Sequence, residues 1–265
     1  MLTAQQITHF ETFGFLLLRQ AFTREEMEAI TREAEVLWQE DLQHQPAGTR
    51  ALHPTPFVEK SPLLAQLPED DRIYLAIEQL LGPGFVWGGS EGSRLIFSEA
   101  DTHEWHSDRA GQIDLQYTRI KIMIYLQEMK KQTGALRVIP GSHRPPLNRN
   151  LLALQPQQQG TSFKAFGVAG PDLPCFALEV QPGDVVVFNH YLYHGVYGKQ
   201  DERRYIAMKF AAEPRSEEQI EALRAHGQDA SYLDETFRHS QRPRIRSMVA
   251  KLLEWEEKMA LPHSG

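Results

Sequence analysis

The sequence predicts a mainly β fold with flanking helices, organised as one domain over residues 1–265. Between residues 85 and 212, short segments rich in Val, Ile, Phe and Tyr are separated by Gly, Pro, Asn or Asp, a pattern typical of an antiparallel sandwich or barrel. On both sides of this region, apolar residues recur at helical spacing. The length suits a single β domain. We therefore expect a helical N-terminal part (1–82), a β core (85–212) and a helical tail (215–260).

Two capping boxes mark helix starts in the N-terminal part. Thr3 and Gln6 have the spacing in which each side chain bonds the other residue's backbone N–H, and Gly14 supplies a helix end. Thr23 and Glu26 repeat this spacing and open a second helix. The other features predicted here are a short strand, a loop rich in Pro, His and Gln, and a third helix: residues 15–18, 43–61 and 70–81.

The core is predicted to contain eight short strands, since its β-branched and aromatic runs are bounded by turn residues. A loop over 144–174 interrupts them, and loops of that length inside a compact domain are usually functional. After Pro214 the spacing becomes helical again, with a broken piece at 216–240 and a longer helix at 242–259. The predicted strands are 85–88, 93–98, 103–108, 118–127, 135–139, 176–180, 184–189 and 203–211.

Composition excludes several classes of protein. Lys and Arg total 28 against 35 Asp and Glu, a net charge of -7, which argues against a dedicated nucleic-acid binder. Cys175 is the single cysteine, so no intramolecular disulfide can form and a reducing, cytoplasmic location is expected. The N-terminus lacks a signal-peptide pattern, and the apolar runs are too short to cross a bilayer. We expect no membrane association, and a monomer or homodimer.

The strongest chemical signal is the stretch Trp105-His106-Ser107-Asp108. On a strand, residues two apart point to the same face, so His106 and Asp108 can present an imidazole and a carboxylate together. His194 follows the predicted strand 184–189 and is the third candidate ligand. Two imidazoles and one carboxylate leave coordination positions open, which suits a non-haem Fe(II) centre that also binds a cosubstrate and O2. A structural zinc site would fill four positions, often with cysteine.

A pair of arginines, Arg203 and Arg204, follows His194 by nine and ten residues. A guanidinium grips a carboxylate with two parallel hydrogen bonds and keeps its charge when buried. A keto acid chelated to iron needs such an anchor for its distal carboxylate. If Arg203 points inward, Ile206 and Met208 point outward to pack under helices. We therefore prefer Arg203 as the anchor and keep Arg204 as the alternative.

These motifs together resemble the phytanoyl-CoA dioxygenase family of Fe(II)/2-oxoglutarate-dependent oxygenases, over roughly residues 3–212. The resemblance implies a double-stranded β-helix, a jelly roll of the cupin type. It also implies iron binding by His106, Asp108 and His194. The stretches that carry the resemblance are Thr3 to Ile7, Phe10, Gly14 to Leu16, Trp105 to Asp108, Gly134 to Arg144, Gly183 to Phe188, His194-Gly195 and Arg203.

The resemblance places 2-oxoglutarate against Arg203 (alternative Arg204), Met123 and Ser107. The chain departs from the family pattern at two of these points. The arginine usually follows the second histidine by about eleven residues, and here the spacing is shorter. The family often has an aromatic residue near the cosubstrate, where this chain has Met123 or Ile124.

The resemblance implies hydroxylation of an unactivated C–H bond in a small polar or anionic metabolite, with decarboxylation of 2-oxoglutarate to succinate by Fe(II) and O2. Related halogenases have a small residue in place of the carboxylate, and Asp108 is retained here, which favours hydroxylation. Two alternatives stay open. One is a non-oxidative jelly-roll isomerase or hydrolase with the same three ligands. The other is a catalytically silent metal-binding module.

Overall fold

The computed structural model describes residues 1–95, 103–109, 117–155, 164–198 and 202–260. Its strands are β1 (Phe15–Leu18), β2 (Ala51–Leu52), β3 (Val86–Leu95), β4 (His103–His106), β5 (Arg119–Tyr125), β6 (Thr133–Val138), β7 (Phe176–Leu178), β8 (Val185–Asn189), β9 (His194–Gly198) and β10 (Arg203–Ala211). The helices are α1 (Ala4–Phe13), α2 (Arg24–Leu42), α3 (Asp71–Leu81), α4 (Leu147–Asn150), α6 (Glu217–Arg224), α7 (Glu235–Arg238) and α8 (Pro243–Ala260).

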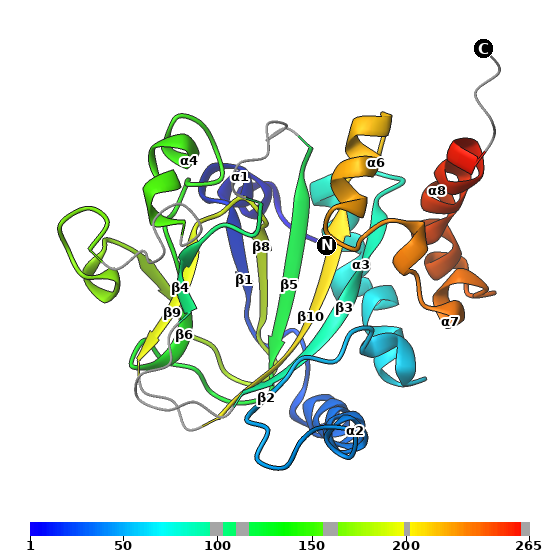
Figure 1. The fold of residues 1–265 in the computed structure, drawn as a ribbon, viewed down its shortest axis with the longest axis horizontal. Coiled ribbons are helices and arrows are strands. Elements are labelled where there is room, and N and C mark those ends of the chain that lie inside the picture. Colours follow the sequence, from blue (N-terminus) through cyan, green and yellow to red (C-terminus); the bar gives the residue numbers. More distant parts are fainter. Residues whose placement is uncertain (96–102, 110–116, 156–163, 199–201, 261–265) are drawn as a thin grey trace.

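The strands form two sheets that face each other (Figure 1). The larger sheet has the order β1-β8-β5-β10-β3-β2 and the smaller one β4-β9-β6-β7, and their neighbouring strands are antiparallel. From β3 to β10 the chain passes repeatedly between the two sheets, which is the connectivity of a double-stranded β-helix. The predicted mainly β fold with flanking helices is thus confirmed.

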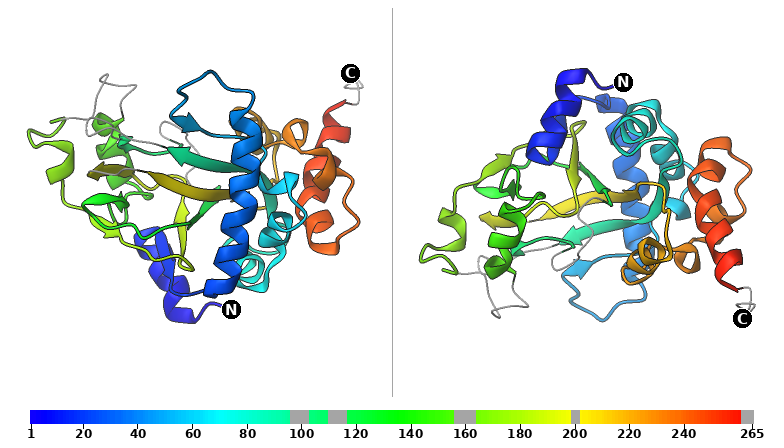
Figure 2. Two further views of the ribbon diagram at one scale, coloured as in Figure 1. Left: turned by 90° about the horizontal axis from the view of Figure 1, so that it is seen from below. Right: turned by 90° about the horizontal axis from the view of Figure 1, so that it is seen from above.

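The period-two alternation of β5 separates two apolar layers. Ile120, Ile122 and Ile124 point outward into a core that the larger sheet shares with the helices, where Trp38 of α2 is also buried. Met123 belongs instead to the core between the two sheets. Figure 2 shows α2 crossing one face of the larger sheet. The helices therefore cover the outer face of this sheet and leave its inner face for the site.

The predicted helix starts of the N-terminal part are confirmed. Thr3 and Gln6 form a complete capping box, and Gly14 ends α1 in the left-handed conformation. Thr23 and Glu26 form the second box at the start of α2. The loop at 43–61 contains the short strand β2 and a single 3-10 turn at Val58–Lys60.

The structure corrects three predictions about strands. β4 ends at His106, whereas the sequence suggested a strand over 103–108. β3 runs unbroken from Val86 to Leu95, whereas the sequence suggested separate segments at 85–88 and 93–98, of which residues 96–98 lie outside the described part. Gly89 has φ +89°, and the pairing register with β10 shifts opposite it, so the glycines bulge the strand instead of ending it. The strand β9 begins at His194, in a stretch that follows the predicted strand 184–189 and where the sequence predicted no strand.

The long predicted loop at 144–174 is partly ordered into α4 and two 3-10 turns. Most of its Gln-rich segment, residues 156–163, lies outside the described part. The helical tail packs against the larger sheet, because Met248 of α8 shares a core with Trp87 of β3 and Phe210 of β10. Among the described residues, we find no helix with the length and apolar content needed to span a bilayer.

Candidate metal centre

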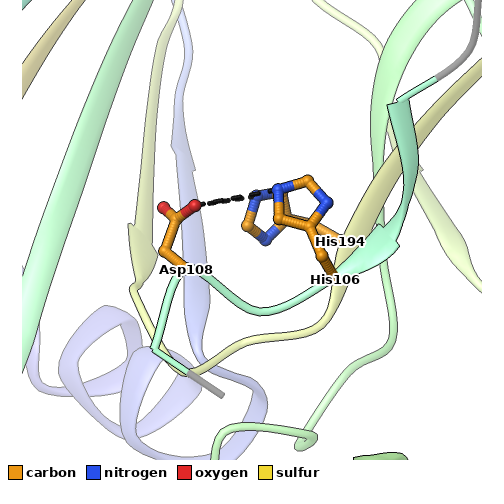
Figure 3. A group of neighbouring side chains, drawn as sticks. All are labelled: His106, Asp108 and His194. Carbon is orange, nitrogen blue, oxygen red and sulfur yellow. Dashed lines mark ion pairs between the residues drawn. The ribbon is translucent and has the colours of Figure 1, made fainter. Parts of the chain in front are cut away.

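The three predicted ligands meet at one point. His106 on β4 is directly opposite His194 on β9, so the pairing of these strands brings the two rings to the same face, 4.3 Å apart between centroids. Asp108 follows β4 in a turn, and its Oδ1 lies 3.7 Å from Nε2 of each histidine. The three side chains point toward a common centre (Figure 3).

Backbone carbonyls fix the tautomer of both histidines. Nδ1 of His106 lies 2.7 Å from the Glu104 carbonyl, and Nδ1 of His194 lies 2.8 Å from the Leu192 carbonyl. A carbonyl only accepts, so each Nδ1 must carry its proton and donate it. Each Nε2 then presents a lone pair toward Asp108, which is the arrangement that a metal-binding histidine requires.

The protonation states also suit a metal. Burial, together with the neighbouring His106, lowers the pKa of His194 to about 3, so this imidazole is neutral at physiological pH. Burial of Asp108 opposes its ionisation, yet Lys121 and the surrounding histidines outweigh that effect and hold the pKa of the carboxyl well below its usual range. The centre thus offers the anionic carboxylate of Asp108 beside the neutral imidazole of His194.

The donor set fits a ferrous ion. Two imidazoles and one carboxylate on one side of a metal are the facial arrangement of non-haem Fe(II) oxygenases. Bonds of about 2.1 Å at right angles would put neighbouring donors about 3 Å apart, so the observed 3.7 Å separations need only a small inward rotation. Within the described part of the chain, the group of potential ligand residues comprises these three, which leaves coordination positions for other ligands.

Ser107 lies between two of the ligands and is used within the fold. Its hydroxyl donates to the His190 carbonyl and accepts from the Arg109 N–H, while its own N–H donates to Oε1 of Gln155. These bonds hold the turn that positions Asp108. The predicted contact of Ser107 with 2-oxoglutarate remains a prediction.

The two adjacent arginines have opposite environments. Arg203 is 1% exposed and belongs to the inner face of β10. Its Nη2 donates to the Tyr125 hydroxyl at 2.6 Å, and its guanidinium lies over the rings of Tyr125 and Tyr205. Arg204 points outward and forms ion pairs with Glu35 and Glu202. Of the two candidates, only Arg203 faces the space between the sheets.

Met123 also faces this space, whereas Ile124 packs in the outer core. The Tyr125 hydroxyl lies 3.8 Å from the Met123 sulfur, so Met123, Tyr125 and Arg203 form a continuous inner surface. Tyr125 and Tyr205 were not among the site residues predicted from the sequence. Their positions two residues from Met123 and Arg203 would have placed them on the same strand faces.

Two further histidines lie near the centre. A register shift between His103 and His106 breaks the alternation that would place them on opposite faces of β4. Burial lowers the pKa of His103 to about 4, and the charges of Arg203 and His106 act in the same direction. His53, from the loop at 43–61, bonds to the Ser93 hydroxyl of β3 at 2.8 Å. That loop therefore reaches the wall of the site.

Part of this chain is similar in sequence to known dioxygenases. Ectoine dioxygenase from Bordetella parapertussis is 28% identical over 157 residues, which cover 54% of this chain and 50% of that protein. The chain thus spans about half the length of the curated relatives it matches.

Solved structures share the fold. HygX from Streptomyces hygroscopicus with nickel and 2-oxoglutarate bound superposes with a TM-score of 0.63 at 22% identity, covering 80% of this chain and 88% of that one. EctD from S. alaskensis in its apoform gives 0.61 at 21% identity, covering 80% and 77%.

A sequence profile of the phytanoyl-CoA dioxygenase (PhyH) family matches residues 10–204, well over half of the chain. The matched region includes the three converging side chains and the inward-facing Arg203. On this evidence the chain belongs to the phytanoyl-CoA dioxygenase family.

Proposed function

We propose that the protein is an Fe(II)/2-oxoglutarate-dependent oxygenase that hydroxylates an unactivated C–H bond of a small polar or anionic metabolite. The observation that carries this proposal is the convergence of His106, Asp108 and His194 on one point, with both histidine tautomers fixed for metal binding. Membership of the phytanoyl-CoA dioxygenase family supports it. So do the solved neighbours that hold iron, or nickel with 2-oxoglutarate.

The chain's own residues would divide the work as follows. His106, Asp108 and His194 hold the iron, which when bound supplies O2 activation coupled to decarboxylation of 2-oxoglutarate to succinate. Arg203 binds the distal carboxylate of 2-oxoglutarate. Its guanidinium is oriented in advance by the Tyr125 hydroxyl and by the two tyrosine rings, so little freedom is lost on binding. Burial of Arg203 strengthens this contact because water does not compete.

The substrate class follows from size and charge. One similar protein is an ectoine dioxygenase and another has been solved with hygromycin B bound, which supports a metabolite over a macromolecule as substrate. The net charge of -7 argues against nucleic acid. Positive side chains inside the barrel favour a polar or anionic group on the substrate.

Anaerobic titration with Fe(II) and then 2-oxoglutarate tests the proposal first. We expect both to bind to the wild type, and His106→Ala to abolish specific Fe(II) binding. A panel of metabolites is then added with O2, and succinate and O2 uptake are measured. We expect one substrate class to stimulate coupled succinate release. His239→Ala, which removes an exposed histidine outside the site, is the matched control.

Two results would favour the alternatives. Tight metal binding without succinate release for any substrate would indicate a non-oxidative isomerase or hydrolase that uses the same ligands. Weak Fe(II) affinity that His106→Ala leaves unchanged would indicate a catalytically silent module. Either result would contradict the oxygenase proposal.

We also propose that residues 1–265 act as one domain, since α8 shares its core with the strands of the larger sheet. A cytoplasmic location is supported by the single cysteine, Cys175. A monomer or homodimer is our expectation for the assembly, and light scattering on the purified chain would measure it.

A further inference from the structure

Three charged side chains face the inside of the barrel on neighbouring strands. Glu91 on β3, Lys121 on β5 and Lys209 on β10 lie on the inner face of the larger sheet, the face that carries Met123 and Ala207. We call these three residues the charged wall. Charged side chains are rare between packed sheets because desolvation is costly, so their presence here needs a cause.

The charged wall is held together by ion pairs. Nζ of Lys121 lies 3.2 Å from Oε1 of Glu91, and Nζ of Lys209 lies 2.8 Å from Oε2. Each ammonium carries three N–H donors and meets a single oxygen of Glu91, which leaves donors for a ligand. The three side chains are 13 to 22% exposed, although they lie between the sheets. The space inside the barrel therefore reaches them.

The charge of the wall does not balance. Two ammonium groups face one carboxylate of Glu91, and Oδ2 of Asp108 lies 4.0 Å from Nζ of Lys121. Under the proposed function Asp108 is committed to iron. Lys121 is paired with Glu91 and therefore keeps its ammonium charge at neutral pH. One unit of positive charge thus remains for an external anion.

The wall lies apart from the expected anchor of the cosubstrate. Lys209 follows Arg203 by six residues on β10, which separates their Cα atoms by about 20 Å. A carboxylate hydrogen-bonded to Lys121 would lie within about 7 Å of the Asp108 carboxylate. The barrel therefore offers two separate anion positions, one at Arg203 and one beside the metal ligands.

A nearby histidine adds a second observation. His190 is 1% exposed, and within the described part of the chain neither of its ring nitrogens has a hydrogen-bond partner. Its backbone carbonyl accepts a hydrogen bond from the Ser107 hydroxyl, so His190 lies beside the turn that carries Asp108. A buried imidazole without a partner costs free energy unless a ligand completes its hydrogen bonds.

We propose that Lys121 and Lys209, held in place by Glu91, form the anion subsite for the substrate, and that this substrate is a small carboxylic acid. A carboxylate suits the subsite because each ammonium keeps N–H donors that Glu91 does not use. With its acid group held at this subsite, the substrate would present to the metal centre a C–H bond only a few bonds away from that acid group. That the bound acid is the substrate rests on the proposed function, whereas the anion-binding position itself does not.

The direct test is crystallographic, with bromide as a heavy monoanion. Crystals of the nickel-substituted protein with 2-oxoglutarate are soaked in sodium bromide, and anomalous scattering locates the ion. We expect a peak between Nζ of Lys121 and Nζ of Lys209 in the wild type. We expect no peak in Glu91→Gln/Lys121→Met/Lys209→Met, a variant that removes all three charges of the wall and leaves no unpaired buried carboxylate. Lys130→Met, which removes an exposed lysine, should keep the peak.

Solution measurements then separate substrate from cosubstrate. In turnover assays with matched pairs of a carboxylic acid and its primary amide, we expect succinate release from acids alone. For such an acid, Lys121→Met should raise KM about tenfold to a hundredfold, and Lys121→Arg should recover part of the loss. The dissociation constant of 2-oxoglutarate should stay unchanged in both variants.

Three outcomes would overturn the inference: no bromide at the lysines, equal turnover of acids and amides, or a raised 2-oxoglutarate dissociation constant in Lys121→Met. The last would assign the wall to the cosubstrate. Failure of the oxygenase proposal looks different, because bromide would still bind at the lysines while Fe(II) would bind weakly or no substrate would stimulate succinate release.

Discussion

Neighbouring residues on one strand can have opposite roles, and Arg203 and Arg204 illustrate this. We predict that Arg203→Met raises the dissociation constant of 2-oxoglutarate about tenfold to a hundredfold, because a buried charge-assisted contact is lost. Arg204→Met is the matched control, since that side chain pairs with Glu35 and Glu202 on the outer side. Anaerobic calorimetric titration measures both. Equal effects of the two substitutions would contradict the assignment.

Through a single residue, His143, the free energy of unfolding should depend on pH. Burial lowers its pKa to about 4, and Arg144 acts in the same direction, while the bond to the Glu11 carbonyl opposes the shift. The unfolded chain has an ordinary histidine pKa near 6.5 and so binds a proton first as pH falls. The stability that depends on neutral His143 is therefore complete above pH 6.5 and is lost between 6.5 and about 4.

This loss amounts to about 3 kcal/mol over that range. We predict that His143→Gln lowers the free energy of unfolding at pH 7.5 but makes it less dependent on pH between 6.5 and 4. Chemical denaturation at several pH values measures this. An unchanged slope in the variant would show that His143 is not responsible.

At the scale of elements, β3 and the loop at 43–61 depend on one close approach. Gly92 donates its N–H to the Pro54 carbonyl, and a Cβ at this glycine would lie 2.4 Å from the Phe57 ring. Phe57 is fully buried and stacks on Trp38. A side chain at Gly92 must therefore displace the loop segment that carries His53.

We predict that Gly92→Ala lowers the free energy of unfolding by about 1–3 kcal/mol, as overpacking does elsewhere. Phe57→Ala removes the obstructing ring, so the double variant should be more stable than the sum of the two single effects predicts. Urea denaturation of the four proteins measures this coupling. Strict additivity would mean that the clash with Phe57 is not the cause.

The elements differ in how well the sequence predicted them. The capping boxes at Thr3 and Thr23 fixed helix starts, because capping is a local interaction between residues three apart. The bulge at Gly89 and the start of β9 at His194 were not predicted, since both depend on pairing with distant strands. Turn residues indicate where a chain bends, but the partner strand decides whether the strand ends there.

The site residues likewise divide into those that local spacing predicted and those that depend on contacts between distant strands. Period-two spacing on a strand over 103–108 led to His106 and Asp108, but β4 ends at His106 and Asp108 reaches the centre from the following turn. Their meeting with His194 required the pairing of β4 with β9. Arg203 was preferred over Arg204 from the outward positions of Ile206 and Met208, and the structure places those residues in the outer core. The charged wall escaped prediction because Glu91, Lys121 and Lys209 are ordinary surface residue types that only the closed barrel brings together.

At the scale of the whole molecule, the tail stabilises the sheet from outside. Met248 of α8 is fully buried in the core shared with Trp87 and Phe210. We predict that Met248→Ala lowers the free energy of unfolding by about 2–5 kcal/mol and leaves the Fe(II) and 2-oxoglutarate affinities of the folded protein unchanged. Glu257→Ala, on the exposed side of α8, is the control. Weaker Fe(II) binding by folded Met248→Ala would mean that α8 acts on the site.

The two sheets contribute different parts of the interior. His106 and His194 belong to strands of the smaller sheet, while Arg203, Lys121 and Lys209 belong to the larger one. Exchange of inward residues on β3, β5 and β10 would alter which molecules are accepted without touching the atoms that ligate metal. Such a barrel can diversify in ancestry, or be redesigned in the laboratory, by substitutions confined to one of its two halves.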